Sequence, residues 1–155
     1  FNRFILPDDR PAYADPRKIL RQRYKVPIPN NAPGDDWTEA EQKAAFLGFI
    51  GFLKGNLAGQ TSVRVDQAWA SQTAILQGIT QVLIPQAVVH EHQMNQVLPA
   101  LAHDAGVENA PEPAGEGMPG PHPLKAVYDG KLEQQLIDIY RRDYIGFGFT
   151  RWNKR

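Results

Sequence analysis

The sequence predicts a mainly α-helical chain with a few short β-strands. Several segments repeat apolar residues at helical spacing behind recognisable caps, whereas one short stretch is rich in β-branched residues. The chain has 155 residues, of which 42% are hydrophobic and 22% charged, so it can bury a core. We therefore expect residues 1–155 to form a single folded unit and not a disordered chain.

The first helix is expected to be short, because six prolines punctuate residues 7–36 and exclude long regular elements there. Asp15 is a plausible N-cap with Pro16 in the first turn, followed by a basic run from Arg17 to Arg23. This run is either the solvated face of a linker helix or a surface that faces an anion, and the linker helix is favoured.

The clearest helix begins at Thr38, which forms a capping-box pattern with Glu41. Apolar residues then recur at helical spacing, namely Phe46, Ile50, Leu53 and Leu57. A second helix is expected over residues 67–79, with Trp69 and Gln72 on one side of it because they are three residues apart.

The best strand candidate is Val82–His90, where Pro85 divides the β-branched run and leaves Ala87–His90 as the buried strand. A third helix over residues 95–105 should close at Gly106, and the proline-rich residues 107–124 should form a surface loop. The last long helix is capped by Asp129 and is expected to run to the Arg141-Arg142 pair.

The charge of the chain sums to zero, with 17 Lys or Arg and 17 Asp or Glu, which argues against a nucleic-acid binder. The ends are basic and the middle is acidic: residues 26–124 hold three basic and ten acidic residues. No cysteine is present, so disulfide and thiolate chemistry are excluded. The longest apolar stretch, Ala44–Leu53, is about half of the roughly 20 residues that a membrane span needs, so no transmembrane segment is predicted.

Three groups of residues suggest chemistry. His90 and His92 would share one face of a strand, but without a third ligand at a convincing spacing we assign no metal site. Trp69 on a helix is more often a core residue than a site residue. His122 and Lys125 place a titratable ring and a cation on a loop before a helix, where they could contact an anion or simply be solvated.

Four segments, taken in chain order, carry a family resemblance. They are the helix at 46–53, Asp-Gln-Ala-Trp-Ala-Ser-Gln at 66–72, the hydrophobic run into Glu91 at 88–92, and Tyr-Arg-Arg-Asp-Tyr-Ile-Gly-Phe-Gly-Phe at 140–149. They resemble the C-terminal part of the sulfotransferase family that includes the Golgi carbohydrate sulfotransferases and their bacterial relatives. The last segment matches most closely, whereas Ala68 and Ser71 replace a His and a Pro of the family pattern.

The resemblance implies a larger three-layer α/β fold of the P-loop type and a transfer reaction. A sulfuryl group would move from 3′-phosphoadenosine 5′-phosphosulfate to a hydroxyl of a saccharide or lipid-linked sugar. It further implies that Trp69, Gln72 and Glu91 shape the acceptor site or its supporting shell. His122 and Lys125 are then the candidates for contacting the anionic cofactor or the acceptor. No residue is assigned as the catalytic base.

The Gly-rich phosphate loop and the Arg-Asp-Pro element of that family do not occur in this sequence. Phe1-Asn2-Arg3-Phe4 resembles the helix that follows those elements, so we expect a C-terminal part that is inactive without an N-terminal cofactor-binding half. The alternative is a non-catalytic interaction subunit that docks on a larger complex through an exposed apolar face. In either case we expect a cytoplasmic chain, free or held at a membrane through a partner protein.

Overall fold

The computed structural model describes residues 1–2, 5–7, 13–110 and 120–152, and these residues form helices joined by irregular segments. The chain divides into a larger unit, residues 1–77 with 118–155, and a smaller unit, residues 78–117. The mainly helical prediction is confirmed. The helices are α1 (Ala14–Gln22), α2 (Glu39–Leu57), α3 (Gln72–Thr80), η1 (Glu91–Gln93), α4 (Met94–Asp104), α5 (Leu124–Val127), α6 (Gly130–Ile139) and α7 (Arg141–Phe147).

The prediction of short strands is wrong for the part of the chain that the structure describes. The expected strand Ala87–His90 lies in an irregular stretch over residues 81–90. Val82 and Ile84, in the same β-branched run, are each 86% exposed. A strand needs a neighbour to take its backbone hydrogen bonds, and no described segment pairs with this one.

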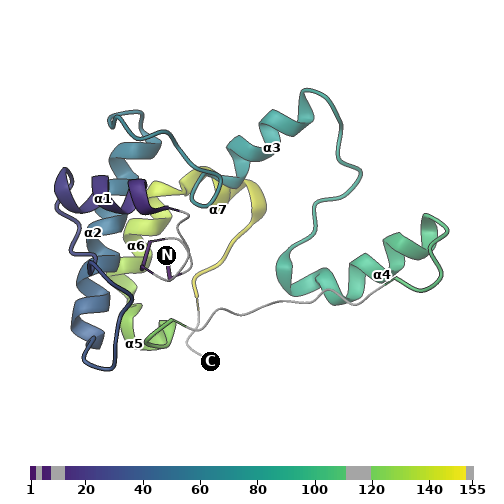
Figure 1. The fold of residues 1–155 in the computed structure, drawn as a ribbon. Coiled ribbons are helices and arrows are strands. Elements are labelled where there is room, and N and C mark those ends of the chain that lie inside the picture. The colour runs from purple at the N-terminus through teal and green to yellow at the C-terminus, as the bar shows by residue number, and fades with distance from the viewer. Residues whose placement is uncertain (3–4, 8–12, 111–119, 153–155) are drawn as a thin grey trace. The chain divides into compact units, whose positions relative to one another are not determined.

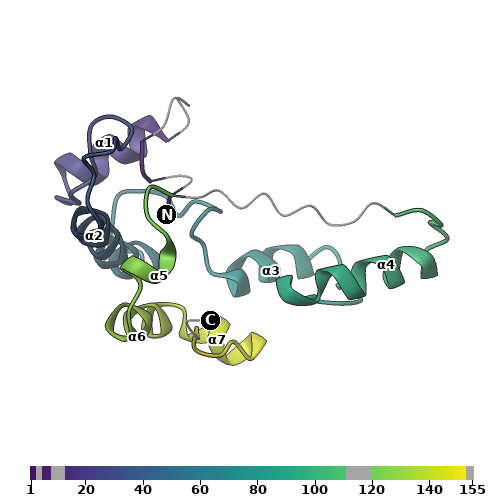
Figure 2. The ribbon, with the colours of Figure 1, turned by 90° about the horizontal axis from the view of Figure 1, so that it is seen from below.

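Helix α2 is the centre of the larger unit and lies between α1 and α6 (Figures 1 and 2). Its capping box is confirmed: Thr38 Oγ1 accepts from the Glu41 backbone N–H, and Glu41 Oε2 accepts from the Thr38 N–H. The helix buries more than the one stripe expected, Ala45 among the further residues, and it packs against α5 and α6 as well as against the core.

Aromatic and aliphatic side chains form one core around α2. Its buried members are Ile5, Leu20, Val26, Ile28, Phe49, Phe52, Leu53 and Trp69. The rings of Phe49 and Trp69 meet edge to face with centroids 5.9 Å apart. At Gly48 a Cβ atom would lie 2.9 Å from Pro27 Cδ, so glycine is what lets the segment before α2 pass this close.

Helix α1 differs from its prediction at its beginning. Tyr13, in the left-handed conformation and without a side-chain cap, precedes a helix that begins at Ala14, and Asp15 lies in the first turn. Two of the basic residues near its end hold loops: Arg21 donates to the Pro29 carbonyl and Arg23 to Ser62 Oγ. These contacts favour a structural role for this basic run over an anion-facing one.

The expected beginning of α3 and the expected end of the last helix are wrong, whereas the expected ends at Asp129 and Gly106 are right. Helix α3 begins at Gln72, so Trp69 lies in the turn before it, and the expected last helix breaks at Tyr140 into α6 and α7. Asp129 caps α6 by accepting from the backbone N–H groups of residues 131 and 132. The third expected helix forms as α4, and Gly106 follows its end with φ +83.

The expected surface loop is irregular at residues 107–110 and 120–123, and residues 111–119 lie outside the described part. Residues 3 and 4, which belong to the Phe1-Asn2-Arg3-Phe4 match, also lie outside the described part. Of the helices in the described ranges, none is both long and apolar enough to cross a membrane.

Replacing the cap of α2 tests how much this helix depends on it. We expect Thr38→Ala to lower the free energy of unfolding by about 0.5–2 kcal/mol, because the backbone N–H of Glu41 loses its acceptor. Urea unfolding measures the change. Thr38→Ser keeps the hydroxyl and should stay close to wild type, and an equal loss in both variants would contradict the cap as the cause.

The Lys43–Asp129 pair joins α2 to the N-terminus of α6, with Lys43 Nζ 2.6 Å from Asp129 Oδ2. The hydrogen bond from Lys43, together with that from the Leu132 N–H, lowers the pKa of Asp129 from 3.8 to about 2. Because the folded pKa lies below the unfolded one, the pair's contribution to stability is present above pH 3.8 and is lost as the pH falls toward 2.

We therefore expect Lys43→Met to raise the pKa of Asp129 toward 3.8 and to flatten the pH dependence of stability between pH 2 and 4. Carboxyl ¹³C NMR titration measures the pKa, and urea unfolding at each pH measures the stability. Lys54→Met removes an exposed lysine of the same helix and should leave the Asp129 titration where it is. An unchanged Asp129 pKa in Lys43→Met would contradict the assignment.

Candidate functional site

The segment Asp66–Thr73, called here the turn segment, is the point where several parts of the larger unit are hydrogen-bonded together. At its beginning Asp66 Oδ1 accepts from the Ala68 backbone N–H at 2.8 Å and from the Tyr13 hydroxyl at 3.1 Å. The Ala70 N–H donates to the Asp66 carbonyl at 2.8 Å. A short-range Asp turn of this kind forms locally, and the contact with Tyr13 fixes it to the N-terminal part of the chain.

Trp69 anchors the turn segment in the core. Its side chain is 6% exposed, and its Nε1–H donates to Asn56 Oδ1 at 2.8 Å. Asn56 is itself 2% exposed, and its amide donates to the Val63 carbonyl at 2.7 Å and to Thr61 Oγ1 at 2.8 Å. The polar end of the indole is therefore satisfied inside the protein, so Trp69 is a supporting residue whose ring is covered.

Tyr140 connects the turn segment to the elbow between α6 and α7. Its hydroxyl donates to the Trp69 carbonyl at 2.7 Å. Burial, with a smaller effect of the nearby Asp143 carboxylate, raises the pKa of Tyr140 to about 12. The phenol therefore stays protonated at neutral pH and keeps donating this bond.

Asp143 closes the N-terminus of α3. Its side chain is 3% exposed; Oδ2 accepts from the Gln72 N–H at 2.8 Å, and Oδ1 accepts from the N–H and the hydroxyl of Thr73 at 2.9 and 2.6 Å. Ser71 Oγ accepts from the Ala74 N–H at 3.1 Å. The first N–H groups of α3 thus have acceptors within the chain, and the position where an external anion would bind is occupied.

Two grooves share the turn segment as part of their lining. One, called here the aromatic groove, has a volume of about 340 Å³ and is lined among others by Gln72, Tyr144 and Phe149. The other, called here the apolar groove, has a volume of about 800 Å³ and is lined among others by Leu57 and Ile145. Ala70, Tyr140 and Asp143 belong to both linings.

Phe149 lines the aromatic groove, and the segment that follows it is held in place by contacts of Trp152. Glu133 of α6, 5% exposed, accepts from the Trp152 backbone N–H, and the Trp152 ring meets Tyr128 edge to face. Burial is the main reason that the pKa of Tyr128 is raised, and it also raises the pKa of Tyr144. Both phenols are therefore neutral hydrogen-bonding groups at physiological pH.

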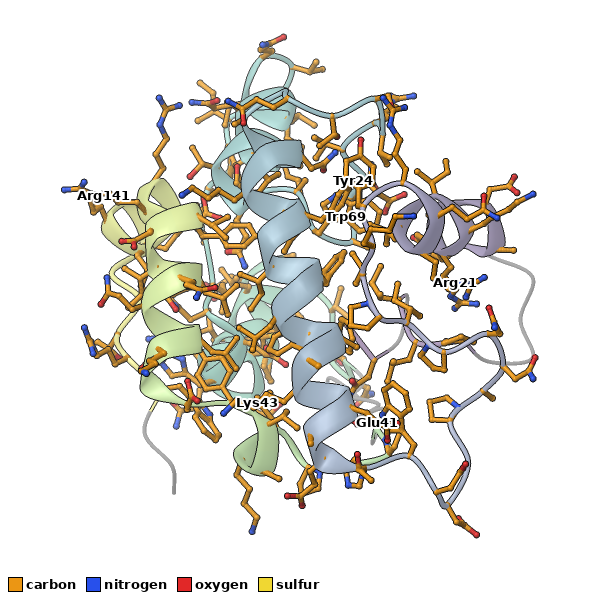
Figure 3. The ribbon with its side chains drawn as sticks, turned by 90° about the vertical axis from the view of Figure 1, so that its left-hand side faces the viewer. Arg21, Tyr24, Glu41, Lys43, Trp69 and Arg141 are labelled. Atoms are coloured by element: carbon orange, nitrogen blue, oxygen red, sulfur yellow. The ribbon has the colours of Figure 1, made fainter. Side chains whose placement is uncertain are left out.

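The structure brings together two of the three predicted acceptor-site residues. Trp69 and Gln72 both line the aromatic groove, although not from one helix face as expected, because Trp69 precedes α3. Figure 3 shows Trp69 beside Tyr24 and α2. Glu91 begins η1 in the smaller unit. Its acceptor-site role stays a prediction.

The predicted cofactor residues lie elsewhere in the larger unit. His122 Nε2 is 2.6 Å from the Trp37 carbonyl, and the His122 carbonyl accepts from the buried Gln42 amide at 3.3 Å. Lys125 is exposed on α5. His122 thus holds the loop before α2, and the cofactor role of this pair stays a prediction.

The His90-Glu91-His92 group does not lie on a strand as the spacing suggested. His92 belongs to the short helix η1, and its ring centroid lies 5.4 Å from that of His90. Within the described ranges no cluster of three potential metal ligands occurs.

Sequence reasoning missed Asp143 and Asn56 as the residues that hold the site together. Asp143 lies in the quoted segment at 140–149, but its partners are about 70 residues away. The signal that could have drawn attention to Asn56 is an Asn among the apolar positions of the expected helix, because such a side chain needs hydrogen-bond partners once it is buried.

Comparison with protein-family models finds no match for this chain, and comparisons with curated proteins and with solved structures find none either.

Asp143 offers the sharpest test of the site's construction. We expect Asp143→Asn to lower the free energy of unfolding by about 1.5–3 kcal/mol, the range for one hydrogen bond to a charged group, because the new amide donor faces backbone N–H donors. Urea unfolding gives the energy, and amide hydrogen exchange should speed up at Gln72 and Thr73.

The matched control is Asp138→Asn, since Asp138 is an exposed carboxylate of α6 that bonds only to the Gln134 amide among the described residues. We expect this variant to change stability by less than about 0.5 kcal/mol. Equal losses in the two variants would show that Asp143 is not the residue that fixes α3.

Proposed function

We propose that the chain is a sulfotransferase-like protein that provides the acceptor side of a sulfuryl-transfer site. The observation that supports it most is that three of the four segments carrying the resemblance form one connected cluster. Phe49, in the segment at 46–53, packs on Trp69, and the Trp69 carbonyl accepts from Tyr140. Asp143 then bonds to Gln72, which joins the segment at 140–149 to the one at 66–72 a second time.

The acceptor in this proposal is a saccharide or a lipid-linked sugar, bound in the aromatic groove. Sugars present apolar C–H faces as well as hydroxyls, which suit aromatic rings and amide groups respectively. Tyr144 and Phe149 bring rings whose centroids are 5.9 Å apart, and Gln72 brings an exposed amide. A concave site with a few polar groups is the usual form of a small-ligand site.

The sulfuryl donor in this proposal is 3′-phosphoadenosine 5′-phosphosulfate, bound chiefly by phosphate-binding elements from an N-terminal portion or a partner protein. In that complete form the helices would cover a parallel sheet of the P-loop type. A role for His122 at the cofactor requires its ring either to release the Trp37 carbonyl or to act through Nδ1. The chain's own residues bind and orient the acceptor.

The second candidate function is a non-catalytic interaction subunit, and one observation favours it. None of the described residues of the smaller unit is buried, although Val82, Leu83, Ile84 and Val88 are large and apolar. Residues 78–117 contain five Asp or Glu and no Lys or Arg. The described residues of this unit form no core of their own, and such a segment gains by docking on another surface.

Ligand titrations distinguish the two functions. We expect cellobiose or lactose to shift the amide resonances of Gln72 and Phe149 in the full chain, and isothermal calorimetry to detect no binding of 3′-phosphoadenosine 5′-phosphate. Gln72→Ala should weaken the saccharide about threefold to tenfold, which corresponds to one hydrogen bond. Gln135→Ala, which removes an exposed amide of α6 outside this groove, is the matched control.

Absence of any saccharide-induced shift would contradict the acceptor role and favour the interaction subunit. Micromolar binding of the nucleotide would show that the cofactor site lies within this chain, and that part of the proposal would then be wrong.

A further inference from the structure

The apolar groove has features that the proposed acceptor site does not use. Leu57 at the end of α2, Val65, Ile139 at the end of α6 and Ile145 in α7 contribute to its lining. Its volume of about 800 Å³ falls within the range of about 300–1,000 Å³ that small-molecule sites occupy. The groove is therefore large enough for an organic ligand with several carbon atoms.

Part of this apolar lining is open to water. Ile145 is 73% exposed and Val65 is 39% exposed. Covering such surface removes apolar area from water, which is favourable. The walls thus favour a ligand whose body is apolar.

Two exposed arginines bring positive charge to this groove. Arg141 and Arg142 are exposed, and neither has a hydrogen bond or ion pair with another residue of the described ranges. Figure 3 shows Arg141 at the outer edge of the α6–α7 elbow. Of the two carboxylates in the lining, Asp143 is buried and bonded to α3, whereas Asp138 is exposed and accepts one hydrogen bond from the neutral Gln134 amide.

Ser71 adds a neutral donor to the same lining. Its Oγ accepts from the Ala74 N–H at 3.1 Å, which leaves the hydroxyl proton for an acceptor on a ligand. Guanidinium and hydroxyl donors together suit a carboxylate, sulfate or phosphate oxygen.

We infer that the apolar groove binds a free single-chain amphiphile, with its chain against the apolar walls and its anionic head group at Arg141, Arg142 and Ser71. Neither half of the site suffices alone. Two exposed arginines bind a small anion weakly because water screens them, whereas a neutral chain leaves the arginines without a partner. This binding site is independent of the proposed sulfuryl transfer.

Titration of the full chain with sodium decanoate, below its micelle concentration, tests the inference. We expect saturable binding by calorimetry and amide NMR shifts at Ser71 and Ile145. Decanol has the same chain without the charge, and acetate has the charge without the chain, so each should bind at least about tenfold more weakly. Vesicles of phosphatidylglycerol test the same head-group charge on a membrane.

Variants locate the site. Arg141→Gln with Arg142→Gln should weaken decanoate about tenfold, and Ile145→Asp should abolish binding by placing a negative charge in the groove. Both positions are exposed, so the fold is expected to survive, and unfolding curves check this. Lys18→Gln removes an exposed cation of α1 outside the groove and should leave the affinity at its wild-type value.

Several results would overturn the inference. They are decanol binding as tightly as decanoate, an unchanged affinity in the double arginine variant, an equal loss in Lys18→Gln, or binding to vesicles without binding to monomeric decanoate. Each shows that the head group, the place or the source of the ligand has been assigned wrongly.

Discussion

The bond between the Asp143 carboxylate and the N-terminus of α3 is the contact on which the site depends. A carboxylate that is 3% exposed is costly to bury, but here it receives two backbone N–H groups and a hydroxyl at the positive end of a helix. Because Asp143 lies on α7 and its donors begin α3, this contact fixes where the turn segment ends. It also occupies the N-terminus of α3, where an external anion would otherwise bind.

The turn segment is held from several directions, and the two grooves follow from that. Tyr13 and Asn56 hold its beginning and its tryptophan, while Tyr140 and Asp143 hold its end from the elbow between α6 and α7. The elbow exists because the expected single helix breaks at Tyr140. Side chains on the elbow, such as Tyr144 and Ile145, therefore line separate grooves that share the Tyr140 residue.

Net charge is a poor guide to which arginines of this chain are available to a ligand. Arg21 and Arg23 come from a basic run, yet their guanidinium groups bond to loop oxygens of the same chain. The sequence predicts Arg141 and Arg142 at the C-terminal end of one long helix, where they would suit its dipole. In the structure they follow the break at Tyr140, and neither is paired with another described residue. The availability of a charge is set by its neighbours in space.

The sequence by itself determined the features that form through local contacts. The caps of α2 and α6 and the helix before Gly106 could be predicted because each rests on residues within a few positions of one another. The strand at Ala87–His90 could not be judged in this way, since a strand exists only beside a partner. Likewise only the tertiary structure decided that Trp69 lies in a turn and that Asp143 caps α3, because those bonds join residues 13 and 70 positions apart.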